Sequence, residues 1–244
     1  MPLKAILFDL DETLLDDNRA FQIAVASSCI DLAHRHNSVD PHRLREAYFE
    51  VSDRFWSELG RVRAWTTYTD GDGQAIRRLL WSQALTEQSV LDEAVAETAT
   101  TLYTGHRRRT YVAYPDVGPA LAALQGRYPL AIITNGFGDT QREKLAVLDL
   151  ASYFPLVLCS GELGAGKPDP AIFHLALDKL NIAPGEAMHV GDSLTTDVAG
   201  AKAAGITAVW LNRAGVPRPA DTTVPDHEIS SLLELEALLD DTLS

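Results

Sequence analysis

The chain has 244 residues, of which 46% are hydrophobic and 23% charged, a balance typical of a globular protein with a filled core. Its 21 basic and 34 acidic residues give a formal charge of −13, which argues against a nucleic-acid polymer as ligand, because phosphate backbones are bound by clustered Lys and Arg. With only Cys29 and Cys159 and no C-x-x-C pair, neither a disulfide framework nor a zinc cluster is expected. Signal-peptide and membrane-span patterns are missing, so we expect a soluble, cytoplasmic protein without a membrane segment.

The first predicted element is a buried strand, residues 5–8, which ends in the acidic segment 9–13 (DLDET). A continuous apolar run is typical of a parallel strand covered on both faces. If the chain stays extended, Asp9 and Asp11 point to the same side. Two neighbouring carboxylates need a proton or a cation between them, and Mg²⁺ is the natural hard cation. The alternative is a simple acidic turn or helix cap.

Residues 16–110 predict a helical insertion. One helix is predicted over 21–32, with a frayed end at 34–38, and a second begins near Pro41. Two more are predicted at 75–85 and 90–103, with a turn at 70–73. Roughly 90 helical residues are far more than a β-α-β crossover needs, so we interpret 16–110 as a separate helical cap domain. Its aromatic residues Trp56, Trp65 and Tyr68 are expected in a core or hinge, although one of them could face a substrate. Five of its arginines are expected to be solvated, with the alternative that one of them binds a substrate anion: Arg61, Arg63, Arg107, Arg108 and Arg109.

From residue 111 onward the pattern alternates between strand and helix. Strands are predicted at 129–133, 156–158, 187–190 and 206–211, and helices at 115–125, 139–148, 168–180, 195–204 and 232–239. Such alternation gives a parallel sheet with helices on both faces. We therefore expect an α/β, doubly wound core made of residues 1–15 and 111–244, with ligands bound outside the carboxyl ends of the strands.

Polar residues follow two of these strands. Thr134 and Asn135, with Gly136 allowing close approach, suit a phosphate or carboxylate oxygen, or form a plain polar turn. Asp192 follows a buried strand and a glycine, whereas Asp197 could be an ordinary helix cap.

Three further residues lie between or within these elements. Lys167 precedes a proline, which excludes a P-loop; it could reach an anion as a point charge or be an exposed loop lysine. His189 is expected to be a packed histidine, and Cys159, without a paired histidine pattern, is not expected to be a catalytic thiol.

Taken in order, these segments resemble the four motifs of haloacid dehalogenase superfamily hydrolases. The matching segments are 9–13 (DLDET), Thr134, the Lys167-Pro168 pair, and 191–197 (GDSLTTD). Residues 134–136 followed by 140–144 look most like the N-acylneuraminate-9-phosphatase and pyrimidine nucleotidase-like members of the phosphatase branch, which carry a helical cap.

The resemblance implies a Mg²⁺-dependent phosphomonoester hydrolase that acts on a small phosphorylated metabolite, a sugar phosphate or nucleotide, through a phospho-aspartyl intermediate. It implies that Asp9 is the nucleophile and that Asp11 protonates the leaving oxygen and then activates water. Mg²⁺ would be held by Asp9, the backbone carbonyl of Asp11, and Asp192. The implied phosphate-binding set is Leu10, Asp11, Thr134, Asn135 and Lys167, and the implied supporting residues are Thr13 and Asp197.

Three alternatives stay open at this point. A 2-haloacid dehalogenase also uses the first Asp, but those enzymes lack an acid two residues later and need no metal, so Asp11 and Asp192 speak against it. A phosphomutase would return the phosphoryl group from a bisphosphate. A non-enzymatic phospho-accepting signalling domain would be shorter and would lack the helical insertion. The sequence names neither the substrate nor the oligomeric state.

Overall fold

The computed structural model describes residues 2–61 and 73–242. Six strands form one sheet in the order β3-β2-β1-β4-β5-β6, and every neighbouring pair is parallel. The strands are β1 (Ala5–Phe8), β2 (Leu130–Thr134), β3 (Leu156–Cys159), β4 (Ala187–Gly191), β5 (Thr207–Leu211) and β6 (His227–Ile229). The predicted α/β fold with a doubly wound parallel sheet is confirmed.

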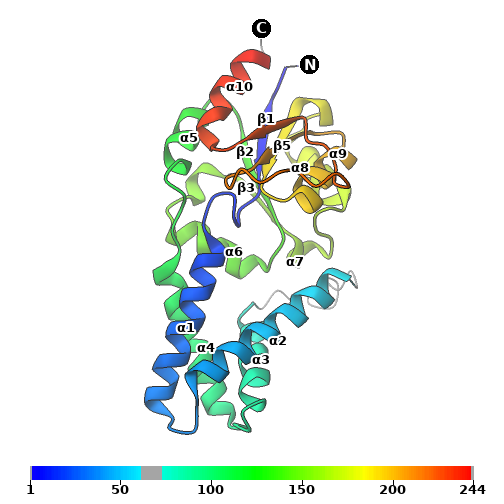
Figure 1. The fold of residues 1–244 in the computed structure, drawn as a ribbon. Coiled ribbons are helices and arrows are strands. Elements are labelled where there is room, and N and C mark those ends of the chain that lie inside the picture. The colour runs from blue at the N-terminus through cyan, green and yellow to red at the C-terminus, as the bar shows by residue number, and fades with distance from the viewer. Residues whose placement is uncertain (1, 62–72, 243–244) are drawn as a thin grey trace.

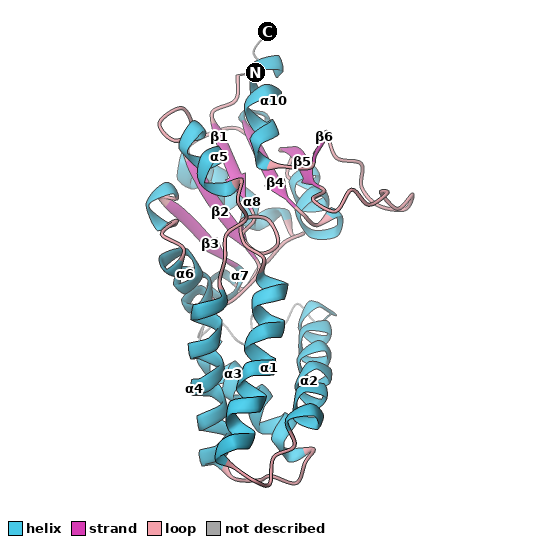
Figure 2. Cartoon of the chain, turned by 60° about the vertical axis from the view of Figure 1, so that its left-hand side comes forward, coloured by secondary structure: helices cyan, strands magenta, loops and turns pink. Residues whose placement is uncertain are grey.

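Helices cover both faces of the sheet (Figures 1 and 2). They are α5 (Val117–Leu124), α6 (Gly138–Val147), α7 (Ser160–Leu163), α8 (Pro170–Leu180), α9 (Ala199–Ala203) and α10 (Leu235–Thr242). Side chains alternate along each strand, so Ile6 and Phe8 of β1 enter one apolar layer, whereas Leu7 enters the other, together with Phe173 of α8. Burial on both faces explains why the strands read as continuous apolar runs.

Four described helices are inserted between β1 and β2: α1 (Asp17–Arg35), α2 (Pro41–Arg61), α3 (Gly73–Thr86) and α4 (Glu93–Thr110). They have their own apolar cluster, centred on the stacked rings of Tyr48 and Trp81, whose centroids are 4.1 Å apart. Figure 2 shows these helices as an elongated block beyond one end of the sheet. As a division into domains, 16–110 stays a prediction.

The structure differs from the expected elements at three helix starts. Helix α8 begins at Pro170, not Pro168, because the Asp169 carboxylate caps it by accepting from the Ala171 N–H at 2.9 Å. Helix α6 begins at Gly138, one residue before the expected start at 139, and the Asp139 carboxylate accepts from the N–H of Gly73 at 3.3 Å, which joins α3 to α6. Near 195 the chain first makes a π-helical turn, Leu194–Val198, and only then α9.

Other differences concern the tail and the cap. β6 was not predicted, since it has only three residues. Trp65, Tyr68, Arg63 and most of the turn predicted at 70–73 lie outside the described residues, as does the side chain of Arg61. Within the described chain, no helix has both the length and the apolar character needed to cross a membrane.

Candidate active site

The centre of the site is a group of acids at the carboxyl ends of two neighbouring strands. Asp9 follows β1 and Asp192 follows β4, and the two strands are paired through Phe8 and Val190. The Asp9 N–H continues this pairing by donating to the Val190 carbonyl at 2.9 Å. Asp9, Asp192 and Asp197 each present a carboxylate oxygen within 4.8 Å of the others. Residues nearly two hundred positions apart therefore meet at one rim of the sheet.

Lys167 is buried between two of these acids. Its Nζ donates to Asp9 Oδ1 at 2.5 Å and to Asp197 Oδ1 at 2.6 Å, and only 3% of its side chain is exposed. Burial would lower the pKa of the Lys167 ammonium, but Asp197 and Asp9 outweigh it and raise that pKa. The expected alternative of an exposed loop lysine is therefore wrong.

Asp197 is a buried ion-pair partner and not a helix cap; Ser193 caps the following turn. Besides Lys167, its Oδ1 lies 3.0 Å from Nε2 of His189, and its Oδ2 accepts from the Ser193 N–H at 3.0 Å. Burial would raise the pKa of Asp197, yet the Lys167 charge and the hydrogen bond from His189 hold it well below its usual range. The packed histidine expected at 189 is buried against Phe173, and it also supports Asp197.

The other two acids, Asp9 and Asp192, have too little positive charge nearby to offset their burial and mutual repulsion. Burial, followed by repulsion from Asp197 and Asp192, raises the pKa of Asp9 well above its usual range in spite of Lys167. Burial and Asp197 raise the pKa of Asp192 to about 7. A divalent cation would relieve this repulsion, and an all-oxygen donor set fits a hard ion such as Mg²⁺. Because both oxygens of Asp197 are already engaged, Asp9 and Asp192 are the carboxylates suited to hold it.

Asp11 belongs to a second set of contacts. Its Oδ1 accepts from Lys144 Nζ at 2.7 Å and its Oδ2 from Gln141 Nε2 at 3.1 Å. Gln141 also donates to Thr134 Oγ1 at 2.7 Å, which leaves the Thr134 hydroxyl hydrogen free to donate to a ligand. Although Asp9 and Asp11 are two residues apart, their carboxylates contact different lysines, because the chain turns immediately after the strand.

This second set reaches into the inserted helices. Lys144 lies 3.0 Å from Asp17 Oδ1 at the start of α1, and the same oxygen accepts from Arg107 Nη2 of α4 at 2.7 Å. Burial would lower the pKa of Lys144, but Asp11 and Asp17 outweigh it and raise that pKa. The expectation that Arg107 is solvated is wrong, since only 4% of the residue is exposed; its neighbour Arg108 is exposed and pairs with Glu143.

The remaining predicted residues surround these two sets. The Asn135 amide holds the main chain of Lys167 on both sides, accepting from its N–H and donating to its carbonyl, each at 2.8 Å. The Leu10 side chain is fully buried in the apolar core, so only its main chain can face a ligand. Thr13 is buried, and its hydroxyl lies 3.4 Å from Asp192 Oδ1.

Sequence reasoning missed Gln141, Lys144, Asp17 and the inward position of Arg107. One signal was available: Gln141 and Lys144 are three residues apart on the helix that follows the Thr134 segment, and such residues share a helix face. For Asp17 and Arg107, which are 90 residues apart, no local pattern indicates the contact.

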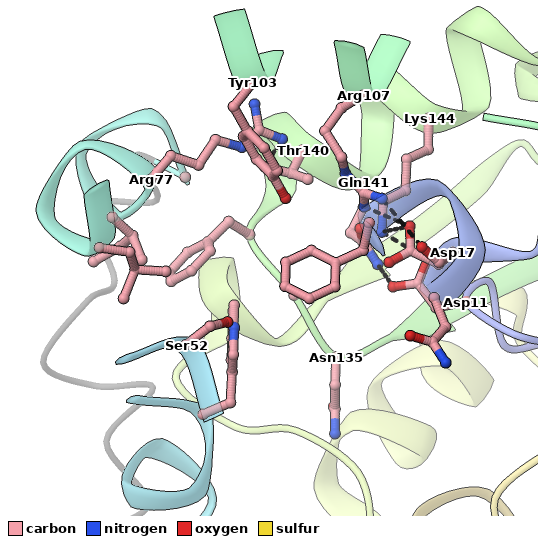
Figure 3. A pocket seen from close by; sticks show the side chains of 18 of the residues that line it. Asp11, Asp17, Ser52, Arg77, Tyr103, Arg107, Asn135, Thr140, Gln141 and Lys144 are labelled. Carbon is pink, nitrogen blue, oxygen red and sulfur yellow. Dashed lines mark hydrogen bonds and ion pairs between the residues drawn. The ribbon is translucent and has the colours of Figure 1, made fainter. Parts of the chain in front are cut away.

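A pocket of about 410 Å³ opens beside Asp11, between the rim of the sheet and the inserted helices. Figure 3 shows Asp11, Gln141 and Lys144 on one side of it, and Ser52, Arg77 and Tyr103 from the inserted helices on the other. A volume of this size holds a ligand larger than a phosphate group alone, since ligand pockets span about 300–1,000 Å³.

The fold and the site together define an α/β enzyme with an acidic centre at the carboxyl rim of a parallel sheet. The family of haloacid dehalogenase-like hydrolases matches residues 3–205, and the chain belongs to that family.

Relatives of known name match over nearly the whole chain. A phosphoserine phosphatase of Thermus thermophilus is 35% identical, with 96% of this chain and 98% of the relative covered. Human N-acylneuraminate-9-phosphatase is 32% identical, with 97% and 94% covered. A solved structure described as a 2-haloacid dehalogenase from Pseudomonas syringae pv. Tomato is 31% identical, with 98% and 99% covered and a TM-score of 0.74. The family and the enzyme class predicted from the sequence, a phosphatase of the haloacid dehalogenase type, are confirmed.

Proposed function

We propose that the protein hydrolyses phosphomonoesters of a small metabolite in a Mg²⁺-dependent reaction through a phosphorylated Asp9. The observation that carries the proposal is the meeting of Asp9, Asp192 and Lys167 at one rim of the sheet, within reach of one phosphoryl group. The names of the two phosphatase relatives, which are similar over nearly the whole chain, support it.

In the first step an Asp9 carboxylate oxygen attacks phosphorus, and the bond from phosphorus to the leaving oxygen breaks. Asp11 gives its proton to that oxygen, so the leaving group departs as an alcohol. Burial and the neighbouring charge of Asp17 raise the pKa of Asp11, which favours the protonated form that this step needs.

In the second step water attacks the phosphorus of the acyl phosphate while Asp11 takes up a proton. The bond from phosphorus to Asp9 breaks, and inorganic phosphate leaves. Lys167 and the Thr134 hydroxyl stabilise the phosphoryl oxygens in both steps. A bound Mg²⁺, held by Asp9 and Asp192, would neutralise carboxylate and phosphoryl charge. Asn135 keeps Lys167 in place through its main chain.

The test is release of inorganic phosphate from p-nitrophenyl phosphate and from a panel of sugar phosphates, nucleotides and small phosphoesters, with Mg²⁺ and with EDTA. We expect turnover only with Mg²⁺. Asp9→Ala should lower it by at least about 10³-fold because the nucleophile is gone, with little change in thermal unfolding. Asp221→Ala, which changes an exposed acid, is the matched control.

Appreciable Mg²⁺-dependent phosphate release by the Asp9→Ala variant would contradict the nucleophile assignment. Chloride release from a 2-haloacid without Mg²⁺ would instead favour the dehalogenase chemistry named for the solved structure of Pseudomonas syringae. Transfer of phosphate within a bisphosphate would favour a phosphomutase, and a stable phosphorylated form without turnover a signalling domain.

A further inference from the structure

The pocket beside Asp11 must receive the leaving group, because Asp11 protonates the leaving oxygen in the proposed reaction. Its apolar wall comes from the inserted helices and includes Phe21, Tyr48 and Tyr103. Figure 3 shows Arg77 of α3 entering from the side opposite Asp11, with Tyr103 and Thr140 near its guanidinium. The chemistry of Arg77 therefore bears on which leaving group fits.

Arg77 has only weak neutral partners among the described residues. Its Nη1 lies 3.4 Å from Thr104 Oγ1 and its Nη2 3.4 Å from Thr140 Oγ1, both near the outer limit for a hydrogen bond. Its guanidinium carbon lies 5.8 Å from the centre of the Tyr103 ring. A guanidinium has five N–H donors in a planar fork, so most of its donating capacity is left for a ligand.

The other two cations that line the pocket already have carboxylate partners. Lys144 lies between Asp11 and Asp17, and Arg107 donates to Asp17. Glu12, the third acid of the lining, accepts from the Asn18 N–H at 2.6 Å at the start of α1, where a helix favours negative charge. Within the described residues, no carboxylate is paired with Arg77.

We propose that Arg77 determines specificity by binding a carboxylate on the leaving group, so that the substrate is a phosphomonoester of a hydroxy acid. A planar guanidinium matches a carboxylate with two parallel hydrogen bonds. One unmatched cation balances one negative charge, which suits a carboxylate better than a second, dianionic phosphate. The inference rests on the proposed function, since it concerns the leaving group of that reaction.

The test uses p-nitrophenyl phosphate turnover with Mg²⁺ as the reporter and measures how matched phosphoesters compete with it. 6-Phosphogluconate and sorbitol 6-phosphate are open-chain six-carbon phosphoesters that differ at carbon 1, where one has a carboxylate and the other a hydroxymethyl group. For the wild-type protein, we expect the inhibition constant of 6-phosphogluconate to be about tenfold to a hundredfold lower than that of sorbitol 6-phosphate, as charge-assisted hydrogen bonds imply. Comparing inhibition by fructose 1,6-bisphosphate with inhibition by fructose 6-phosphate measures the effect of a second phosphate.

In Arg77→Met the ratio of the two inhibition constants should fall to near one. Arg78→Met is the matched control, because Arg78 is exposed and pairs with Glu93; it should keep both the ratio and the reporter rate. A purely structural role for Arg77 would weaken both competitors equally and leave the ratio unchanged.

Three results would overturn the inference. The first is that 6-phosphogluconate and sorbitol 6-phosphate inhibit the wild-type protein equally, or that neither inhibits it. The second is an unchanged ratio of their inhibition constants in Arg77→Met, and the third is a preference seen only for the bisphosphate. In each of these cases the reporter is still hydrolysed, so the proposed function stands. Failure of the wild-type protein to hydrolyse p-nitrophenyl phosphate with Mg²⁺ would instead count against the proposed function itself.

Discussion

At the scale of single residues, the acids of the site differ in what surrounds them. Asp197 has Lys167, His189 and a main-chain N–H on its two oxygens, and its pKa is low. Asp192 is half-buried near Asp197, its Oδ1 accepts from the Thr13 hydroxyl at 3.4 Å, and its pKa is raised. Two aspartates five residues apart thus suit different tasks: one holds the lysine, and the other is suited to a cation.

Asp192→Asn tests this division. The substitution removes the charge but keeps the shape, so we expect the Mg²⁺ concentration for half-maximal phosphate release to rise by about tenfold or more, because one charged oxygen ligand is lost. A Mg²⁺ titration of phosphate release measures it, with Asp221→Asn as the exposed-acid control. An unchanged Mg²⁺ requirement would speak against Asp192 as a ligand.

At the scale of elements, the carboxylate of Asp116 helps to join the C-terminal segment to the core. Asp116, just before α5, accepts on Oδ2 from Arg213 at 2.9 Å, from the Ser231 hydroxyl at 2.9 Å and from the Leu232 N–H at 2.8 Å. Burial would raise the pKa of Asp116, but these hydrogen bonds and the charge of Arg213 lower it. The contact fixes the start of the last helices beside α5.

Asp116→Asn should lower the free energy of unfolding at pH 7 by about 1–3 kcal/mol, since hydrogen bonds to a charged group are lost. The pKa of Asp116 in the folded state lies below the unfolded value of about 3.9. Its carboxylate therefore stabilises the fold fully above about pH 3.9, and this contribution is lost as the pH falls through the folded-state pKa. The difference between variant and wild type should therefore narrow below about pH 4.

Urea unfolding at pH 7 and at pH 3 measures the effect. Asp178→Asn, an exposed acid on α8, should change the unfolding free energy by less than about 0.5 kcal/mol. A difference for Asp116→Asn that grows on acidification would contradict the assignment.

At the scale of the whole molecule, the inserted helices are joined to the sheet by buried charge as well as by apolar contacts. Arg107 of α4 donates to the carboxylate and the carbonyl of Asp17, and its guanidinium carbon lies 4.9 Å from the centre of the Tyr111 ring. Through Lys144 the same network reaches Asp11. The inserted helices and the rim of the sheet therefore share one set of ion pairs.

Arg107→Met should lower the free energy of unfolding by about 2–4 kcal/mol, less than for a fully broken buried pair because Asp17 keeps Lys144. Arg108→Met, the next residue along, should change it by no more than about 1 kcal/mol, since an exposed pair contributes little. Denaturant unfolding of the two variants side by side measures both. Equal losses would mean that burial of Arg107 adds nothing.

Much of the fold could be predicted because its signals are local. The strands are continuous apolar runs, since a parallel sheet covered on both faces needs them, and the insertion shows helical texture over its described length. Asp9, Thr134, Lys167 and Asp192 stood out because each is a polar residue beside a buried strand or in an adjoining loop. The start of α8 and the three-residue β6 were missed, because a cap and an edge strand depend on details too short for a periodic pattern.

The fold class, the enzyme family and the meeting of Asp9, Lys167 and Asp192 could be predicted without coordinates, because parallel strands bring their carboxyl ends to one rim of the sheet. How the charged side chains pair became visible in the folded chain alone. Lys167 pairs with Asp9 and Asp197, and Lys144 pairs with Asp11 and Asp17. Arg107 points inward, and Arg77 has no carboxylate partner among the described residues. The reason is physical. Pairing depends on burial and on distances of a few ångströms between segments far apart in the chain, and no local pattern of residues encodes either.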